Sequence, residues 1–348
     1  VHPDDLRYQK YIGQTFQVEL GAAKPLEIKI IASRSVDPTF GTGALGVTPA
    51  HSMADFEMYE QQKHENNPIA IISVIGLDGK MNENAGPNYQ GLTVTAAREK
   101  FVAWLNAQGL IEKEENIIQN AGTSDRFQDV LEALPMTQWW LDVNKIIPGR
   151  GLNLKDLMRQ AVTTGLNNDS TQKVTIIPDR FMKLYLARVE NLRDWCLSRQ
   201  IWWGHRIPIW YCRQAQNEKC RAPIVSTMAI TVCPHCGGAV EQDPDTLDTW
   251  FSSGSWTFST LGWPKKTADL KTYHPTSWMQ MGYEILYLWL MRMILMSAYA
   301  LGEIPFRKAL IHGMVRDEHG QKYSKSAGNG IDPIEIIDNY GCDALRLS

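Results

Sequence analysis

A buried strand that runs into a polar loop and then a helix is the feature that most constrains the fold of this chain. Residues 309–315 (ALIHGMV) are almost wholly apolar, residues 316–329 are polar, and a helix is predicted from about Pro333. In α/β proteins such a unit places the polar residues at the C-terminal edge of a sheet, where ligands bind. The C-terminal part of the chain is therefore predicted to be an α/β domain with a ligand site after this strand.

The N-terminal part is predicted to be a separate, mixed α/β domain. Apolar runs predict strands at residues 25–31 and 69–74. Helical periodicity predicts a helix at 93–108, and a further helix is expected at about 55–62, after a glycine-rich loop. From residue 138 onward tryptophans become frequent. Because 348 residues suit two domains of roughly 150 residues or more, we expect domains at residues 1–135 and 136–348.

Composition and charge exclude several classes of protein. Hydrophobic residues are 44% and charged residues 21%, which is typical of a soluble globular protein and not of a disordered tail, a fibre or a disulfide scaffold. The net charge of −3 excludes a uniformly basic surface, but it leaves a local nucleic-acid interface open. The start of the chain has no signal-peptide pattern. The apolar run 285–301 contains Arg292, so a buried helix is favoured over a membrane span and no membrane partner is expected.

Four of the six cysteines lie close together in the sequence. Cys233 and Cys236 form a C-x₂-C half-site, and Cys212 and Cys220 precede them with seven residues between the two. Clustered cysteines without a secretory signal favour a metal site over disulfides. Residues 212–236 are therefore a candidate Cys₄ zinc knuckle, and a knuckle that has lost its metal is the alternative. Cys196 and Cys342 are expected to be buried helix residues.

The polar loop contains two lysines and two serines in the run Lys322-Tyr323-Ser324-Lys325-Ser326, followed by Ala-Gly-Asn. Cations and hydroxyl donors on a glycine-flanked loop suit the charge that develops on a transferring phosphate or a departing pyrophosphate. A solvated charged loop is the alternative, but the strand before it and Gly330-Ile331-Asp332-Pro333 after it favour the phosphate role.

In this context the loop resembles the KMSKS signature of class I aminoacyl-tRNA synthetases, with Tyr323 at the methionine position. Further stretches are similar to the valine-specific members: RDWCLSRQIWWGHRIPIWYC (193–212), LDTWFSS (247–253), FSTLGWP (258–264) and GYEI (282–285). The WFDSG-type and DQ-x-RGWF runs of isoleucine-specific members do not occur. The resemblance covers nearly the whole chain.

The resemblance implies the C-terminal half of a Rossmann-like class I catalytic domain, with a mixed α/β editing domain inserted into it. Residues 1–135 would be part of the editing domain and residues 136–348 part of the catalytic domain. The family's HIGH motif and its anticodon-binding domain are absent from the sequence, and residues 204–208 (GHRIP) match a different part of the family. We therefore expect an internal fragment that is inactive by itself.

The resemblance also implies roles for individual residues in ATP-dependent attachment of valine to tRNA. Lys322 and Lys325 would be catalytic, His312, Gly313, Lys325 and Ser326 would bind ATP with its Mg²⁺, and Trp250 and Ile285 would line the valine pocket. For Trp250, plain core packing is the alternative. Glu284 stands where the family often has Asp, so its carboxylate reaches further toward the ligand.

Hydrolytic editing of threonine attached to the tRNA is implied for the N-terminal domain. Phe40, Thr48 and Asp55 match pocket positions, with Asp55 suited to binding the substrate ammonium. Gly46 replaces a usual Lys and Ser52 a usual Asp, so the strength of editing is open. The whole protein is expected to be a cytoplasmic monomer.

A long basic helix over residues 181–199 offers a surface for the tRNA acceptor end, although an ion-paired helix face explains it equally well because acidic residues are interleaved. Its basic residues, with one beyond it, are Arg180, Lys183, Arg188, Arg193, Arg199 and Arg206. A non-catalytic tRNA-binding paralogue and an isoleucine-specific synthetase are the alternative functions; both lysines of the signature are present, which favours the enzyme.

Overall fold

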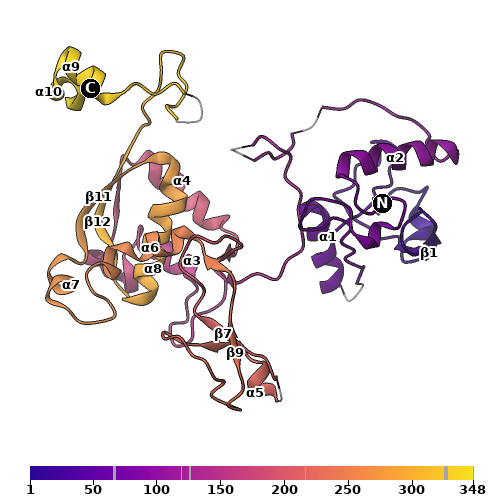
Figure 1. The fold of residues 1–348 in the computed structure, drawn as a ribbon. Helices are drawn as coiled ribbons and strands as arrows, with labels where there is room; N and C mark the ends of the chain where they lie inside the picture. Colours follow the sequence, from indigo (N-terminus) through magenta and orange to yellow (C-terminus); the bar gives the residue numbers. More distant parts are fainter. Residues whose placement is uncertain (66–67, 119, 125–126, 216, 325–327, 348) are drawn as a thin grey trace. The chain divides into compact units, whose positions relative to one another are not determined.

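The computed structural model describes residues 1–65, 68–118, 120–124, 127–215, 217–324 and 328–347. The chain divides into two compact units, Val1–Thr137 and Gln138–Ser348 (Figure 1). Each unit combines helices with short strands, so the architecture is mixed α/β.

The described residues of the N-terminal unit form two α-helices and one antiparallel strand pair. Helices α1 (Met53–His64) and α2 (Val94–Ala107) confirm the two predicted helices, and strand β2 (Leu26–Lys29) confirms the strand predicted at 25–31. β2 pairs with β1 (Thr15–Val18), and the 3₁₀ turns η1 (Gln9–Tyr11) and η2 (Glu83–Ala85) complete the unit. Ser52 and Thr93 cap α1 and α2, since each side chain accepts the N–H of the residue three positions further on.

The strand predicted at residues 69–74 is wrong. These residues form no described strand, and the neighbouring backbone makes only an isolated bridge between Ile75 and Met81. Ile71 and Ile72 are 38% and 43% exposed. An apolar run becomes a strand only when a neighbouring segment forms a ladder of hydrogen bonds with it. Here His51 and Asn82 bond the backbone of Val74, but no described segment forms such a ladder with residues 69–74.

A parallel sheet forms the centre of the C-terminal unit. Its strand order is β11 (Thr276–Gly282), β12 (Phe306–His312), β4 (Thr175–Ile177), and both pairings are parallel. Gly282 is in register with His312, so β11 and β12 end together. β12 ends three residues before the predicted strand end, so residues 313–315 belong to the loop. The predicted C-terminal helix is confirmed as α9 (Pro333–Tyr340), and α10 (Cys342–Leu347) follows it.

The apolar run 285–301 is a buried helix, as predicted. It begins with η5 (Tyr283–Ile285), continues as a π-helical turn, η6 (Leu286–Leu290), and ends as α8 (Met291–Ala300). Seven of the ten residues of α8 are buried. α8 packs against α3 (Leu154–Gln160) and α6 (Thr249–Ser259) in the main core. In the part of the chain that the structure describes, no helix combines the length and apolar character needed to cross a membrane.

The long basic helix predicted at 181–199 is wrong in its second half. Helix α4 covers only Arg180–Glu190. Strand β5 (Trp195–Cys196) then pairs with β3 (Trp140–Leu141), and β6 (Ser198–Arg199) pairs with β10 (Thr246–Leu247). These partners lie about 50 residues away in the sequence, so tertiary pairing overrides the local helical pattern. The basic residues therefore lie on several elements and not on one helix face.

The two remaining cysteines also differ from expectation. Cys196 lies on β5 and not in a helix, and Cys342 is exposed on α10 and not buried. The other four cysteines belong to a small antiparallel sheet and its loops, with strand order β8 (Ile224–Val225), β7 (Ile209–Cys212), β9 (Val240–Gln242) and helix α5 (Glu218–Arg221) beside it. The remaining elements of the unit are η3 (Leu166–Asn168), η4 (Ser170–Gln172) and α7 (Ala268–Tyr273).

Candidate functional site

Two side chains of opposite charge meet at the C-terminal edge of the parallel sheet. Glu284 lies in η5, directly after β11, and Lys322 lies in the loop after β12. The Lys322 Nζ atom is 2.6 Å from Glu284 Oε1 and 2.8 Å from Oε2, so the ammonium contacts both carboxylate oxygens. The side chains are 51% and 30% exposed, respectively, so a ligand can reach the pair.

A small hairpin carries Lys322. Arg316 and Lys322 form an antiparallel bridge, and the turn between them closes with the Gly320 N–H donating to the Asp317 carbonyl at 2.9 Å. Gly320 has a φ of +75°, a left-handed conformation that glycine adopts without strain. The Arg316 guanidinium donates to the Gly320 carbonyl at 2.7 Å and to the Tyr283 hydroxyl at 3.4 Å, which joins the hairpin to η5.

The Asp317 carboxylate holds this hairpin together. It accepts the side-chain amide of Asn329 at 2.8 Å and the backbone N–H groups of His319 and Gln321 at 3.0 and 2.7 Å. The bond from Asn329, with those from the two N–H groups, outweighs burial and lowers the pKa of Asp317 below its usual range. Asp317 is therefore ionised at neutral pH, and its role is to fold the loop that bears the lysine.

The predicted ATP-binding residues lie at the same edge, as far as the structure describes them. His312 is the last residue of β12 and is exposed, with its Nδ1 atom 2.6 Å from the Gly313 carbonyl oxygen. Beside it the backbone of Gly282 is close to the Met314 side chain, because a Cβ at Gly282 would lie 2.7 Å from the sulfur. Lys325 and Ser326 lie outside the described residues.

The predicted valine-pocket residues lie on neighbouring elements of the core. Trp250 is in the first turn of α6, Ile285 ends η5, and both are partly buried. α6 packs against η6, and the Trp289 indole N–H donates to the Ser253 carbonyl at 3.0 Å, which ties these two elements together. Trp250 is thus neither fully buried core nor free surface.

Asp248 positions the start of α6. Its carboxylate accepts the Trp250 backbone N–H at 3.1 Å, the Trp195 indole N–H at 2.9 Å and the Arg199 guanidinium at 2.7 Å. The guanidinium of Arg292 lies 3.9 Å from the centre of the Trp195 ring. Burial lowers the pKa of Arg292 to about 10 although Asp248 opposes the shift, so Arg292 remains charged at neutral pH.

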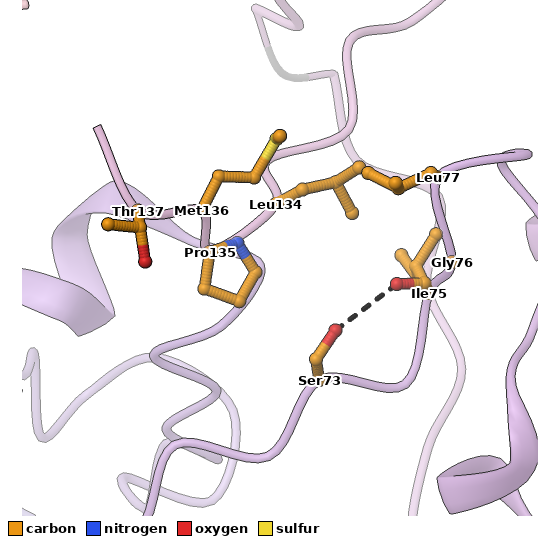
Figure 2. A pocket seen from close by; sticks show the side chains of 8 residues that line it. All are labelled: Ser73, Ile75, Gly76, Leu77, Leu134, Pro135, Met136 and Thr137. Atoms are coloured by element: carbon orange, nitrogen blue, oxygen red, sulfur yellow. Dashed lines mark hydrogen bonds between the residues drawn. The ribbon is translucent and has the colours of Figure 1, made fainter. Parts of the chain in front are cut away.

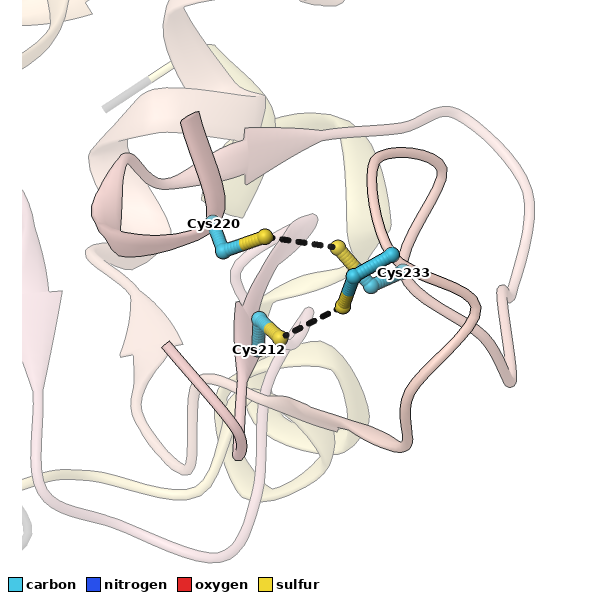
Figure 3. Close-up of side chains that lie close together, drawn as sticks. Cys212, Cys220 and Cys233 are labelled. Carbon is cyan, nitrogen blue, oxygen red and sulfur yellow. Dashed lines mark hydrogen bonds between the residues drawn. The ribbon is translucent and has the colours of Figure 1, made fainter. Parts of the chain in front are cut away.

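The four clustered cysteines converge. Their Sγ atoms all lie within 4.8 Å of one another, with Cys212 and Cys236 at 3.5 Å and Cys220 and Cys233 at 4.0 Å (Figure 3). Four sulfurs bound tetrahedrally at about 2.3 Å from zinc would be roughly 3.8 Å apart, so the cluster fits this metal. The C-x₂-C turn closes with the Gly237 N–H on the Cys233 carbonyl, and Gly237 has a φ of +72°.

Ionisation within this cluster is strongly coupled. Burial alone would raise the pKa of Cys233, but the backbone N–H groups of His235 and Cys236 and the neighbouring thiols outweigh it and lower the pKa to about 7. At Cys236 the bond from the Gly238 N–H lowers the pKa. Burial and the other three sulfurs raise it by more, so the pKa of Cys236 is about 12. The Cys233 thiolate therefore forms readily, whereas a Cys236 thiolate needs a cation to compensate its charge.

In the N-terminal unit the structure joins two of the three predicted editing residues. The backbone N–H and the hydroxyl of Thr48 donate to Asp55 Oδ2 at 2.8 and 3.1 Å, and Asp55 is 7% exposed. Phe40 lies in the preceding loop and is 67% exposed. This geometry gives Asp55 a structural task, which is to hold the glycine-rich loop against α1.

A cavity of about 310 Å³ lies elsewhere in this unit (Figure 2). It is lined by Ser73, Ile75, Gly76, Leu77 and residues 134–137, and by none of the predicted editing residues. His51 braces the two segments that line it. Its Nε2 accepts the N–H groups of Val74 and Ile75, and its Nδ1 contacts the Ala133 carbonyl at 2.8 Å.

Sequence reasoning missed the partners of Lys322 and of Asp248. The run Asp317–Gly320 carries a turn signature, with Asp first and Gly fourth, from which the hairpin could have been predicted. Arg292 within an apolar helix was a signal for a buried counter-charge. The contact between Glu284 and Lys322 had no local signal, because 38 residues separate them.

Comparison with known proteins assigns the class. A family model described as class I tRNA synthetases (I, L, M and V) matches residues 47–348. The chain therefore belongs to this family.

Relatives that match the whole chain include valine–tRNA ligases. One from Dehalococcoides mccartyi strain CBDB1 is 43% identical and one from Carboxydothermus hydrogenoformans is 44% identical, each over the whole chain. The chain spans 36% of the length of each of them. A solved Agrobacterium radiobacter K84 LeuRS–tRNA–LeuAMS complex is 26% identical, with a match that covers 48% of this chain and 27% of that chain and a TM-score of 0.36.

Proposed function

We propose that this chain is part of an enzyme that attaches valine to its tRNA at the expense of ATP. Within it, residues 136–348 would be the C-terminal half of a Rossmann-like catalytic domain, and residues 1–135 part of an inserted editing domain. The observation that carries this proposal is the contact between Lys322 and Glu284 at the C-terminal edge of the parallel sheet where His312 ends β12, in a chain of the class I synthetase family.

In the first step the valine carboxylate attacks the α-phosphorus of ATP. A carboxylate–phosphorus bond forms, the bond to the bridging oxygen breaks, and pyrophosphate leaves with the electron pair. Lys322 and Lys325 would stabilise the negative charge that builds on the phosphates. His312, Gly313 and Ser326 would bind the nucleotide. Among the described residues no His, Asp and Glu side chains cluster as a metal cage, so Mg²⁺ would be held chiefly by the ATP phosphates and water.

Selection of the amino acid is assigned to Trp250 and Ile285. Trp250 is held by the backbone N–H bond to Asp248, so its place at the start of α6 is well determined. A pocket built from apolar side chains excludes larger amino acids by shape but distinguishes poorly against an isostere that carries a hydroxyl. Threonine would therefore enter, and a hydrolytic editing site would be required.

Editing of threonyl-tRNA is proposed for the glycine-rich loop of the N-terminal unit, with Phe40, Thr48 and Asp55 as the residues involved. Asp55 already accepts two bonds from Thr48 on one carboxylate oxygen, so a substrate ammonium would contact the other oxygen. Gly46 leaves this loop without the lysine that the family often has there.

In the second step the terminal ribose hydroxyl of the tRNA attacks the valyl carbonyl, and AMP leaves. Arg180, Lys183 and Arg188 of α4 remain candidates for contact with the acceptor end. Arg199 and Arg206 do not, because Arg199 pairs with Asp248 and Arg206 donates to the Asp243 and Gln242 carbonyls. The complete protein would act as a monomer in the cytoplasm.

A structural zinc ion is proposed for Cys212, Cys220, Cys233 and Cys236. The sulfur geometry and the low pKa of Cys233 support it. The ion would pin α5 and the C-x₂-C turn to β7 and has no role in the chemical steps.

A chimera tests the proposal directly. The matching segment of the Carboxydothermus hydrogenoformans relative is replaced by this chain, and valine-dependent ATP–pyrophosphate exchange is measured. We expect exchange with valine and not with isoleucine. Lys322→Ala should lower the rate by about a hundredfold to a thousandfold, because the charge acts mainly in the transition state. A non-catalytic paralogue would give a folded chimera that binds tRNA without exchange.

A further inference from the structure

The ion pair between Glu284 and Lys322 is built into the sheet edge. Glu284 directly follows β11, whose last residue, Gly282, is in register with His312 of β12. Lys322 belongs to the hairpin that leaves β12. Both carboxylate oxygens lie within 2.8 Å of the Lys322 Nζ atom, so this one acidic residue binds the ammonium through both of its oxygens.

The hairpin does not depend on this pair for its fold. The Asp317 carboxylate closes the turn, and the Asn329 side chain joins Asp317 at 2.8 Å to the Lys322 carbonyl at 3.2 Å. The Arg316 guanidinium donates to the Gly320 carbonyl within the turn. Removing the Glu284 charge would therefore free the lysine side chain while the loop keeps its shape.

The pair is also weak enough to be exchanged. Both side chains are partly exposed, and ion pairs in water-accessible positions contribute little because solvent screens them. An anion that carries two or more charges attracts the ammonium more strongly than a single carboxylate does. Lys322 can thus change partner when a polyphosphate arrives.

We propose that Glu284 is a positioning residue for Lys322, which holds the lysine in a resting ion pair that an incoming polyphosphate must break. This inference rests on the proposed role of Lys322 as a phosphate ligand. Glu284 then lowers the affinity of the free site for phosphate and keeps the lysine at the sheet edge until nucleotide binds.

The first measurement is made on the chimera described above. It is the reactivity of the Lys322 amine toward trace acetic anhydride, quantified by mass spectrometry relative to exposed Lys266 in the same molecule. Glu284→Gln should accelerate labelling of Lys322 by about two- to fivefold, because the shielding carboxylate is lost. Glu284→Asp should give an intermediate rate. Glu318→Gln is the matched control, since Glu318 lies in the same hairpin, is 86% exposed and pairs only with its neighbour His319 among described contacts. Its labelling should equal that of the parent.

The second measurement repeats the labelling with increasing pyrophosphate. Pyrophosphate should protect Lys322 from labelling in the parent, in Glu284→Gln and in the Glu318→Gln control. The concentration that gives half-maximal protection should be about two- to fivefold lower in Glu284→Gln than in the other two proteins. Circular dichroism of the three proteins should be the same.

The outcomes distinguish the resting ion pair from the proposed phosphate-binding role of Lys322. Equal labelling of Lys322 in the parent and in Glu284→Gln overturns the resting pair. Protection at the same pyrophosphate concentration in both overturns the competition while leaving Lys322 as a phosphate ligand. Failure of pyrophosphate to protect Lys322 in either protein contradicts the proposed phosphate role itself, and the competition with it.

Discussion

Asp248 is the residue at which the polar contacts around the proposed valine pocket converge. It accepts bonds from Trp195, Arg199 and Trp250 and is 5% exposed. Asp248→Asn keeps the shape but removes the charge that balances Arg199 and the buried Arg292. We expect the free energy of unfolding to fall by about 2–3 kcal/mol. This loss is smaller than that for a fully buried ion pair because the Arg199 side chain is partly exposed to solvent.

Urea denaturation followed by tryptophan fluorescence measures this loss. Asp338→Asn, at an exposed position on α9, is the control and should change the stability by less than about 0.5 kcal/mol. An equally small effect of Asp248→Asn would show that the network is not needed for stability.

His274 should make stability pH-dependent. Burial lowers its pKa below the ordinary value of 6.5, although the Thr257 carbonyl and Glu303 oppose the shift. The unfolded chain therefore binds a proton at higher pH than the folded chain does, so this contribution is present above about pH 6.5 and is lost as pH falls toward the folded pKa.

We expect the free energy of unfolding to fall between pH 7.5 and pH 5, and to fall less in His274→Gln. Exposed His319→Gln should follow the parent. Parallel stability curves for all three proteins would contradict the assignment to His274.

At the scale of elements, the cysteine-bearing sheet makes a prediction about zinc. We expect about one equivalent of zinc per chain, with an affinity that falls as pH drops through 7, because protons compete for the thiolates. Cys233→Ser should weaken binding at least about a hundredfold and lower the thermal stability. Cys342→Ser is the matched control because that cysteine is exposed on α10. Metal-free protein of unchanged stability would count against the site.

Elements with local signals could be predicted from sequence. α1 and α2 both have capping residues, α2 also has helical periodicity, and both helices form as expected. The segment 191–199 has the same helical pattern but pairs as β5 and β6 with distant strands. Its backbone hydrogen bonds are formed with strands about 50 residues away, which a local sequence pattern cannot indicate. The helix prediction failed there for this reason.

The candidate site divides in the same way. The lysine loop was recognisable from its own residues, and so was the C-x₂-C turn. The partner of Lys322 was not, because Glu284 belongs to another strand end, and only the parallel pairing of β11 with β12 brings the two together.

For the whole molecule, we expect the isolated chain to show no valine-dependent ATP–pyrophosphate exchange. It spans 36% of the length of the valine–tRNA ligases it matches, and the HIGH motif that the proposed ATP site would require does not occur in its sequence. The measurement compares the purified chain with the chimera at equal concentration. Exchange by the chain alone, well above background, would show that these residues form a complete site.

The sequence by itself determined the features that depend on neighbours a few positions apart: the capped helices, the buried apolar helix, the C-x₂-C turn and the lysine loop. Each rests on backbone geometry and periodicity within one segment. Tertiary structure alone decided where β5 and β6 pair, that Asp248 faces Trp195 and Arg199, and that Glu284 holds Lys322. Those contacts join residues tens of positions apart, and local propensity does not favour one such pairing over another. The pairing that buries the apolar side chains and completes the backbone hydrogen bonds is the one that forms.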